Sequence, residues 1–393
     1  MAKLIEITGR PLSGEWGIDD LDGTGIPVLR TTNFTNEGVV NYSDVVTRQI
    51  KKKNLSEKML RYGDIILEKS GGSDKQPVGR VIFFEGEENK YLFNNFTCLL
   101  RVKDTSRWLP KYVFYALFAN YLAGGTLRYE NRTTGLHNLQ TDSYVAAVEI
   151  PMRTLDEQKA IAAHLDKVTQ IIGMQRALEG KLDVLVKSRF IELFGTYPHN
   201  PMGWETGTIR DIVTDVRYGS SRPAVDGGKY PYLRMNNITY GGELDLSDTK
   251  RIDVPETELS KCTVRRGDVL FNRTNSKELV GKTCVYDRDE MMVLAGFVIR
   301  VRVSERVLPE FLSAFLNTDF SKKMLLGMCK AAIGQANINA QEMQNIGLYL
   351  PPIELQKQFV QFKKQTDKSK LAVQQGLQEL EILKKSLMQQ YFG

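Results

Sequence analysis

The sequence is poor in the residues that build metal sites, disulfides and most catalytic centres. Four cysteines and three histidines occur among 393 residues, and no two cysteines have the C-x-x-C spacing. A structural zinc site or a disulfide framework is therefore not expected, and a reducing cytoplasm is the natural compartment. Three unclustered histidines also argue against histidine-based acid–base or nucleophilic catalysis.

Long apolar segments are absent as well. The longest apolar run, MMVLAGFVI at 291–299, is far too short to cross a membrane, and the opening MAKLIEITGR lacks the apolar core of a signal peptide. The hydrophobic share of 42% and the charged share of 25% are those of a soluble globular protein. The net charge of +6 is compatible with a polyanionic partner, although many proteins with such a charge bind none.

Motifs that would mark an enzyme are incomplete. GTGIPV at 23–28 lacks the third glycine of a dinucleotide-binding loop, and SKELVGKT at 276–283 has Ser276 where a phosphate-binding loop needs its first glycine. The Asn/Asp-Pro-Pro-aromatic tetrad of an amino-methyltransferase is missing, and the E-x-K of a nuclease core at 87–90 has no counterpart in the second half. The sequence therefore favours binding over turnover: we expect no enzyme activity and no metal or cofactor in this chain.

The most informative feature of the sequence is a duplication along its whole length. KLDVLVKSRFIELFG at 181–195 returns as ELEILKKSLMQQYFG at 379–393, with leucine, lysine, serine and the final Phe-Gly in register. Other segments match in the same order along both halves: IPVLRTTNF (26–34) with YPYLRMNNI (230–238), YGDIILEKSGGS (62–73) with RGDVLFNRTNS (266–276), PVGR (77–80) with LVGK (279–282), LPKYVFYAL (109–117) with LPEFLSAFL (308–316), and GLHNLQ (135–140) with GQANIN (334–339).

Each half combines short β-like runs between glycine turns, a helical stretch near 109–122 or 308–326, and one long closing helix. A proline stands at the start of each long helix, a Thr154–Glu157 capping box begins the first, and a glycine follows each end. We therefore predict an α/β (α+β) fold with two tandem duplicated domains and mixed β-sheets. Its expected parts are a domain at 1–151, a central helix at 152–196, a second domain at 197–351 and a C-terminal helix at 352–393.

At ~1.5 Å per residue, a helix of about 40 residues is a rod of roughly 60 Å, which is long for a globular protein. Its apolar residues step by three and four, as in a seam that needs a partner helix. One interpretation is that each helix packs on its own domain. The interpretation we favour is an antiparallel coiled coil of the two helices with pseudo-twofold symmetry, whose predicted interface consists of Ile161, Leu165, Val168, Ile172, Leu182, Leu185, Leu377, Leu380, Leu383 and Leu387.

Loops at equivalent places in the two halves combine Arg or Lys with Asn, Thr, Ser and Gly. Arg, Lys and backbone amides can hold phosphates, and Arg and Asn can read guanine and adenine edges. Ordinary turn chemistry is the open alternative. The loop tips differ between the halves, as two readers of different short sequences would require. The candidate DNA-binding residues are Arg30, Thr32, Asn33, Lys69, Ser70, Gly71, Arg132, Thr133, Asn138, Ser220, Arg222, Arg234, Asn236, Asn237, Asn272, Arg273, Thr274, Asn275, Gln335 and Asn337.

Two modules that pass through IPVLR/YPYLR and GDII/GDVL, each closed by a proline-initiated helix that carries Gln-Lys near its start and ends in Phe-Gly, resemble the specificity subunit of type I restriction–modification systems. The resemblance covers essentially the whole chain. It implies two target-recognition domains, similar in fold to the recognition domain of adenine-N6 DNA methyltransferases, and two spacer helices that act as a ruler. Each domain is then expected to read one half of a bipartite, asymmetric DNA site.

The resemblance also implies partners and a division of labour. The subunit itself is non-catalytic and binds double-stranded DNA together with two modification (methyltransferase) subunits and two restriction/translocase subunits. S-adenosylmethionine, ATP and Mg²⁺ are used by those partner subunits, of which the first pair flips the target adenine. The first half departs from the pattern, because GEWGIDDLDGTG at 14–25 replaces the opening that ends in YGSSRP at 218–223.

Two other functions remain open from the residues alone. One is a sequence-independent nucleic-acid-binding scaffold, whose affinity salt alone would set. The other is a stand-alone DNA nuclease or methyltransferase, against which the missing motifs argue. Neither explains the duplicated helix as well.

Overall fold

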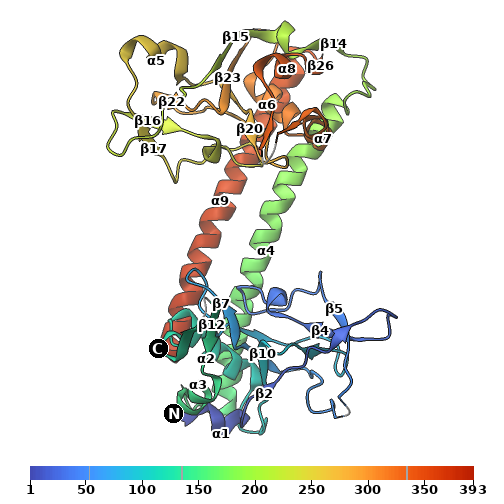
Figure 1. Cartoon of the computed structure of the whole chain (residues 1–393), viewed down its shortest axis with the longest axis vertical. Helices are drawn as coiled ribbons and strands as arrows, with labels where there is room; N and C mark the ends of the chain where they lie inside the picture. Colours follow the sequence, from blue (N-terminus) through green and yellow to red (C-terminus); the bar gives the residue numbers. More distant parts are fainter. Residues whose placement is uncertain (53, 134–135, 333–334) are drawn as a thin grey trace. The chain divides into compact units, whose positions relative to one another are not determined.

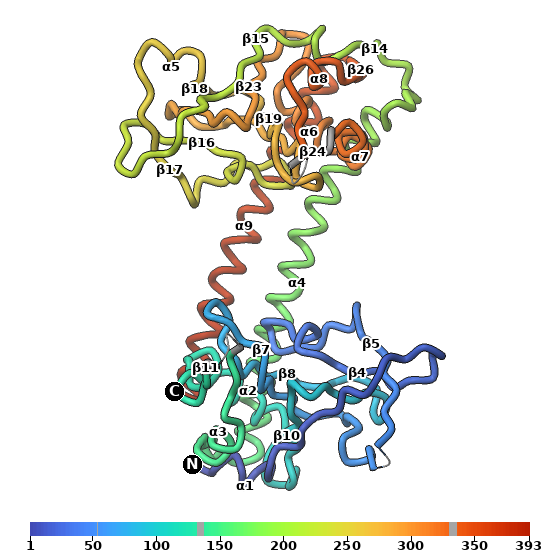
Figure 2. The backbone as a smooth tube through the Cα atoms, in the orientation of Figure 1, coloured from blue at the N-terminus to red at the C-terminus, as the bar shows by residue number. Residues whose placement is uncertain are grey.

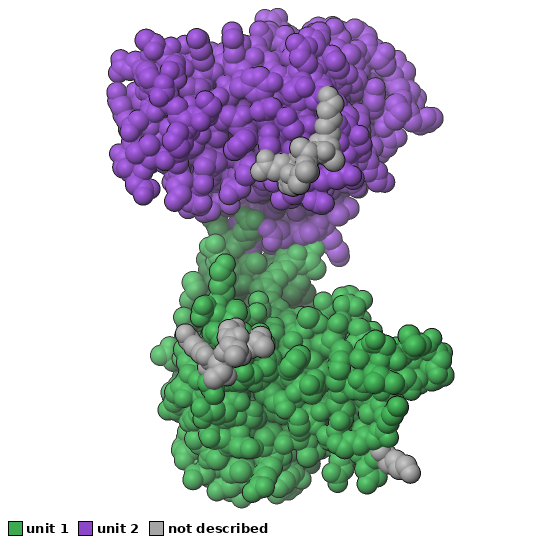
Figure 3. Space-filling view, in the orientation of Figure 1, with its two compact units in different colours: residues 1–177, 374–393 green, residues 178–373 purple. Residues whose placement is uncertain are grey.

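The computed structural model describes residues 1–52, 54–133, 136–332 and 335–393, with the side chains at 132–136 and 330–335 outside the description. The chain forms two compact units, unit 1 with residues 1–177 and 374–393, and unit 2 with residues 178–373 (Figure 3). Each unit therefore contains one β-rich domain and segments of both long helices. This division shares the helices between the units, whereas the sequence treated them as separate parts.

Three small sheets and one strand pair build the β-rich domain of unit 1 (Figure 1). All neighbouring strands are antiparallel except β4 and β9. In sheet order, the strands are β2 (Leu12–Ser13), β10 (Thr97–Leu100), β6 (Ile65–Glu68) and β8 (Val81–Phe83); β3 (Ile18–Asp19), β5 (Val46–Gln49), β4 (Ile26–Leu29) and β9 (Leu92–Phe93); β11 (Glu130–Thr133), β12 (Leu136–Leu139) and β7 (Ser70–Gly72); and β1 (Ala2–Lys3) with β13 (Glu149–Ile150).

The domain of unit 2 also has three sheets and one strand pair, and again one pair, β16 with β22, is parallel. This pair is central in its sheet, whereas the parallel pair β4 and β9 of unit 1 lies at the edge of its sheet. The predicted duplication and the mixed sheets are thereby confirmed. In sheet order, the strands are β15 (Val213–Tyr218), β23 (Val298–Val303), β19 (Val269–Asn272) and β21 (Thr283–Val285); β17 (Lys250–Ile252), β16 (Tyr230–Leu233), β22 (Met292–Leu294) and β18 (Thr263–Val264); β20 (Thr274–Asn275), β25 (Gln335–Asn337) and β24 (Lys330–Ala332); and β14 (Glu205–Thr208) with β26 (Gly347–Leu350).

The central strand of each domain is buried on both faces. Successive side chains of a strand point to opposite faces, so β6 places Ile65 and Leu67 in one apolar cluster and Ile66 in another. In unit 2, β19 divides Val269 and Leu270 between two clusters in the same way. This double burial explains why these short runs are continuously apolar rather than alternating.

Short helices complete the domains. Proline occupies the first turn of both α2 and α6, where its missing N–H costs nothing. The helical stretch expected near 308–326 is in fact two helices. The first ends at Leu316, and Thr318 caps the start of the next, where its hydroxyl accepts a hydrogen bond from the Ser321 N–H. The bounds are α1 (Leu4–Thr8), α2 (Pro110–Leu122), α3 (Thr141–Ala147), α5 (Glu256–Cys262), α6 (Pro309–Leu316), α7 (Asp319–Met328), α8 (Ala340–Gln344), and the 3-10 turns η1 (Thr31–Asn33), η2 (Leu127–Tyr129), η3 (Ile209–Ile212) and η4 (Met235–Asn237).

The two long helices are α4 (Leu155–Phe194) and α9 (Ile353–Phe392), each of 40 residues. The predicted capping box of α4 is confirmed: the Thr154 N–H donates to the Glu157 carboxylate at 2.7 Å, and the Glu157 N–H donates to the Thr154 hydroxyl at 3.3 Å. Gly195 ends α4 with φ at 81°, a conformation that glycine adopts without strain.

Within each unit, the segments of α4 and α9 run side by side and antiparallel (Figure 2). In unit 1, His164 contacts Tyr391 at 3.2 Å, and Arg176 forms an ion pair with Glu381 at 2.9 Å. In unit 2, Asp183 lies 2.9 Å from the Lys370 ammonium, and further along α4 the Arg189 guanidinium lies over the Phe362 ring. In both units, higher residue numbers on α4 therefore face lower numbers on α9.

The apolar seam differs in part from the prediction. Ile161, Leu165, Val168 and Ile172 are buried, but the first two also join the core of unit 1, so the helix packs on its domain and on α9 together. Leu182, Leu377, Leu380 and Leu387 are half-buried. Leu185 and Leu383 are 47% and 46% exposed, which corrects the seam at these positions. After Leu182 the stripe steps by four through Val186, Phe190 and Phe194, and on α9 Lys384 lies over the Phe118 ring in place of Leu383.

Candidate nucleic-acid interface

Two polar loops of unit 1 that are far apart in the sequence meet in one sheet. Strand β7 pairs with β12, so Ser70 lies opposite Asn138. The Ser70 hydroxyl donates a hydrogen bond to the Asn138 side-chain carbonyl at 2.6 Å. The loops around 68–76 and 127–138, which supply separate candidates in the sequence, therefore form a single surface.

A third loop joins this surface through a buried ion pair. Glu68 is 1% exposed, and the Arg80 guanidinium donates to both of its oxygens at 2.7 and 3.0 Å. The same guanidinium donates to the Thr31 carbonyl at 3.2 Å, which attaches η1 to the end of β6. Burial of the guanidinium would lower the pKa of Arg80, but the hydrogen bonds to Glu68 raise it above its usual value.

Unit 2 assembles its three loops in the same way with different residues. The Thr274 hydroxyl donates to the Asn337 side-chain carbonyl at 3.2 Å, and β20 pairs with β25. The Lys282 ammonium donates to the Met235 carbonyl at 2.9 Å and so attaches η4. The two surfaces thus share one framework.

The charges beneath the two surfaces differ. Where unit 1 has Glu68 and Arg80, unit 2 has Asn272 and Lys282, which are 0% and 7% exposed. The Asn272 amide is neutral and donates to the Thr274 and Phe297 carbonyls. Burial lowers the pKa of Lys282 below its usual value. The charges of Glu68 and Arg80 cancel in unit 1, whereas in unit 2 the charge of the buried Lys282 is not cancelled by the neutral Asn272.

Four of the candidate residues hold the loops rather than project from them. The Asn33 side chain accepts from the Arg30 N–H at 2.8 Å and donates to the carbonyls of two later residues, while the Arg30 guanidinium pairs with Asp44 at 2.8 Å. Arg234 and Asn237 repeat every one of these contacts in unit 2. The turn chemistry left open by the sequence therefore accounts for the repeated Arg and Asn. The side chains exposed on these turns are those of Thr32 and Asn236.

Arg273 has a different environment from those four residues. Its guanidinium lies 4.9 Å from the centre of the Tyr218 ring, and within the described part of the chain its Nε has no hydrogen-bond partner. The Tyr218 hydroxyl accepts a hydrogen bond from the Ala340 N–H at 2.9 Å, which fixes the ring. A guanidinium over a fixed aromatic ring is held in place by a cation–π contact. The equivalent residue of unit 1, Lys69, donates instead to the Ser13 hydroxyl at 2.7 Å.

The remaining candidates fall into three groups. Ser220 is buried and its hydroxyl accepts from the Arg222 N–H, while the Arg222 guanidinium pairs with Glu258 at 2.8 Å. Asn275 donates to the Asn272 side chain at 2.9 Å, and Gly71 is exposed. The side chains of Arg132, Thr133 and Gln335 lie outside the described residues.

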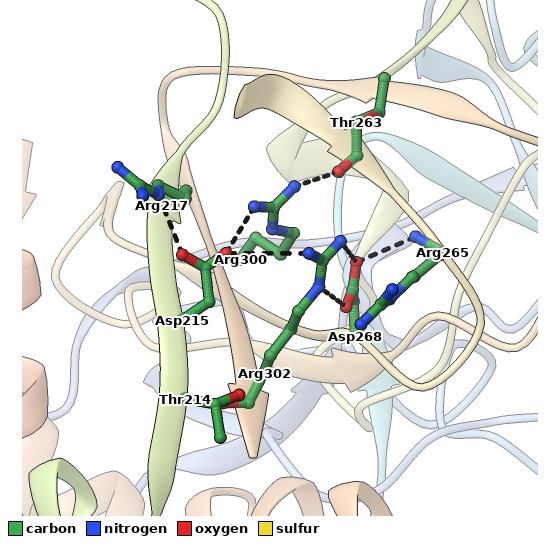
Figure 4. A network of polar contacts seen from close by, with 8 residues as sticks. All are labelled: Thr214, Asp215, Arg217, Thr263, Arg265, Asp268, Arg300 and Arg302. Carbon is green, nitrogen blue, oxygen red and sulfur yellow. Dashed lines mark hydrogen bonds and ion pairs between the residues drawn. The ribbon is translucent and has the colours of Figure 1, made fainter. Parts of the chain in front are cut away.

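The repeated Gly-Asp dipeptide has a role that the sequence did not reveal. The Asp64 carboxylate accepts from the Arg61 N–H and from two nitrogens of Arg101 at 2.7 and 2.6 Å. Asp268 is held in the same way by the Arg265 N–H at 2.9 Å and by Arg302 at 2.8 Å (Figure 4). The one signal for this role in the sequence was the repetition of Gly-Asp in both halves. The pairing itself could not be predicted, because each arginine partner lies more than thirty residues downstream, near the end of another strand.

Unit 2 extends this network. Arg300 is 2% exposed and donates to Asp215 at 2.6 Å and to the Thr263 carbonyl, as Figure 4 shows. Burial would raise the pKa of Asp215, but the hydrogen bonds from Arg300 and Arg217 hold it below its usual value. Two ion pairs thus join β15 to β23, and β23 to the residue that precedes β19.

Other kinds of site are not found in the described ranges. Among these residues, no group of three or more His, Cys, Asp or Glu side chains could hold a metal ion. A search of the same residues finds no helix long and apolar enough to cross a membrane.

Comparison with known proteins gives one family and several relatives. The model of the type I restriction modification DNA specificity domain matches twice, at residues 4–182 and 201–382. The EcoKI specificity subunit of Escherichia coli K12, a type I restriction enzyme subunit, is 24% identical over 378 residues, which are 90% of this chain and 78% of that protein.

Two solved structures share the fold over the whole chain. A chain from work on complex assembly and conformational transition of the type I R-M system has a TM-score of 0.61 at 17% identity and is covered over 96% of its length. The type I restriction–modification S subunit from M. genitalium has a TM-score of 0.53 at 14% identity and is covered over 95%. At these identities the likeness concerns the fold.

Proposed function

We infer that this chain, which belongs to the type I restriction–modification DNA specificity family, reads a bipartite asymmetric site in double-stranded DNA, one half-site for each unit. The observation that carries the proposal is a duplicated framework with different tips. The same turns, each with an Arg–Asp ion pair, support the loops of both units. At one loop, however, unit 1 has Lys69 hydrogen-bonded to Ser13, whereas unit 2 has Arg273 over the Tyr218 ring. A shared framework whose loops carry different side chains is suited to the recognition of two different short DNA sequences.

In the proposed complex this chain is the non-catalytic DNA-recognition subunit. Its helices set the spacer between the half-sites and dock two modification subunits, which use S-adenosylmethionine, while two restriction/translocase subunits use ATP and Mg²⁺, all in the cytoplasm. Large apolar side chains are exposed on the long helices and would supply apolar contacts for docking. They include Met174 and Ile382 in unit 1, at 59% and 69% exposed, and Val184 and Leu371 in unit 2, at 62% and 56%.

The direct test is a selection from random double-stranded DNA with this chain and its modification subunits. We expect a two-part motif, two short fixed sequences separated by a spacer of constant length and undefined sequence. Recovery of DNA without a common motif, with an affinity that depends only on salt, would favour the sequence-independent scaffold instead.

Arg273 provides a residue-level prediction. Replacing Arg273 with alanine is expected to relax base preference in one half-site only, by roughly 5- to 150-fold, the equivalent of ~1–3 kcal/mol for one bidentate base contact. The measurement is competition binding on a set of duplexes with single changes in each half-site. Arg266→Ala is the matched control, because Arg266 is exposed and paired with Asp289. An equal loss on every sequence would identify Arg273 as a phosphate contact.

A further inference from the structure

A buried glutamine stands near the start of each long helix. Gln158 on α4 is 1% exposed, and its side chain makes three hydrogen bonds to the backbone. Its carbonyl oxygen accepts from the Leu109 N–H at 2.8 Å, and its amide nitrogen donates to the Arg107 and Arg153 carbonyls at 3.0 Å each. One side chain thereby joins three segments of unit 1.

Gln356 on α9 makes the same three bonds in unit 2. It is 0% exposed, accepts from the Leu308 N–H at 2.9 Å, and donates to the Arg306 and Pro351 carbonyls at 3.1 and 2.9 Å. The partners are equivalent in position: the residue before the first proline of α2 or α6, the residue two earlier, and the linker five residues before the glutamine. Both units therefore use one device.

The glutamine is one of the polar links between the recognition domain and the long helix. Leu109 caps the start of α2, and α2 packs on β8 of the central sheet. Arg153 belongs to the linker that enters α4. A rotation of α4 relative to α2 would break these bonds and leave buried backbone groups without partners, each of which is costly. The amide therefore restrains the direction of the long helix relative to its domain.

Only an amide fits this position. It offers an acceptor and two donors at once, whereas ionised glutamate has no donor and methionine has no donor and only a weak acceptor. A fully satisfied buried polar group fixes a single geometry more strictly than an apolar contact of the same size.

We propose that Gln158 and Gln356 are positioning residues that fix the direction in which each domain holds its long helix, and thereby set how strictly the protein discriminates between spacer lengths. The proposal rests on the proposed reading of a bipartite site. Neither residue contacts DNA, since both are buried beneath the domain. We expect these residues to affect the preferred spacing between the two half-sites and not the base preference within either half-site.

The two units are not equally restrained. In unit 1 the Tyr112 hydroxyl donates a further hydrogen bond to the Pro151 carbonyl at 2.9 Å, a second tie between α2 and the linker. The equivalent residue of unit 2 is Phe311, which has no hydroxyl and is buried among aromatic rings. Loss of Gln356 is therefore expected to relax spacer discrimination more than loss of Gln158.

The test uses the full chain with its modification subunits and duplexes in which both half-sites are fixed and the spacer is shortened or lengthened by one base pair. In Gln356→Met, the ratio of affinities between the correct and altered spacers is expected to fall about tenfold, roughly 1.4 kcal/mol, with base preferences within the half-sites unchanged. Gln158→Met is expected to lower the ratio less.

Gln170→Met is the matched control, because Gln170 is an exposed glutamine on α4. A variant that merely folds poorly loses binding equally on every spacer, so the ratio separates positioning from stability. If Gln356→Met does not fold, Gln158→Met carries the test, since Tyr112 still ties its linker. A wild-type ratio in the folded variants overturns the proposal, whereas a wild-type protein that selects no two-part motif overturns the proposed function itself.

Discussion

Replacing Phe194 with alanine is expected to destabilise unit 2 by about 3–5 kcal/mol, the usual cost of deleting a large buried aromatic side chain. Phe194 ends α4, is 0% exposed, and packs edge-to-face on Phe311 of α6 at 4.9 Å and on Phe359 of α9 at 5.8 Å. Its removal leaves a cavity where three helices meet. Hydrogen exchange measured by mass spectrometry on the full chain is expected to show faster exchange across residues 178–373.

Ile191→Ala is the matched control for this change, because Ile191 lies in the same last turn of α4 but is 44% exposed. It is expected to leave exchange in unit 2 nearly unchanged. If Phe194→Ala behaved like this control, the end of α4 would not belong to the core of unit 2, contrary to the packing described above.

Replacing Asp268 with alanine is expected to destabilise unit 2 by about 1–3 kcal/mol, because it leaves the partly buried Arg302 guanidinium and the Arg265 N–H without their acceptor. Asp268 is 1% exposed and holds both Arg302 and the Arg265 N–H. After its loss, the carboxylate that remains near the Arg302 guanidinium among the described residues is that of Asp215, at 3.9 Å, and it already pairs with Arg300. Urea denaturation followed by far-ultraviolet circular dichroism measures the change.

Two further variants make this prediction specific. Asp289→Ala removes a carboxylate that pairs with Arg266 at 2.7 Å on the exposed surface, and no resolvable change is expected. Asp268→Ala combined with Arg302→Met is expected to recover part of the loss, because the unpaired cation is removed as well. A single variant no less stable than the surface control would contradict the structural role of the Gly-Asp dipeptide.

The features that the sequence predicted correctly depend on local or repeated signals. The duplication, the Thr154–Glu157 capping box and the stop at Gly195 could be predicted because each depends on residues a few positions apart or on a repeated pattern. The phase of the helix seam could not. A stripe that steps by four rotates around a helix of 3.6 residues per turn, and only the packed domain decides that Val186, and not Leu185, faces inward.

The sequence predicted which kinds of residue form the candidate surface, but not which loops come together to form it. Polar loops at equivalent places pointed to it, yet the meeting of Ser70 with Asn138 depends on strand pairing across the domain. Arg30 and Asn33 attracted attention because they repeat, and the structure gives that repetition a local cause in the turn they stabilise. Their contact with DNA, like that of the other candidates, stays a prediction. Gln158 gave no signal beyond its repetition, because two of its three partners, Arg107 and Leu109, lie about fifty residues earlier in the sequence.

Each long helix has residues in both units, and this has a consequence for folding during synthesis. Domains generally fold in the order in which they leave the ribosome, but the core of unit 1 includes Met388, 3% exposed, and Phe392 against Tyr112 at 5.2 Å. These residues are translated only after the whole second domain. During synthesis, the apolar core of unit 1 therefore stays incomplete and partly exposed until the C-terminal end of α9 has been made. That segment follows the second domain in the sequence but packs into the first.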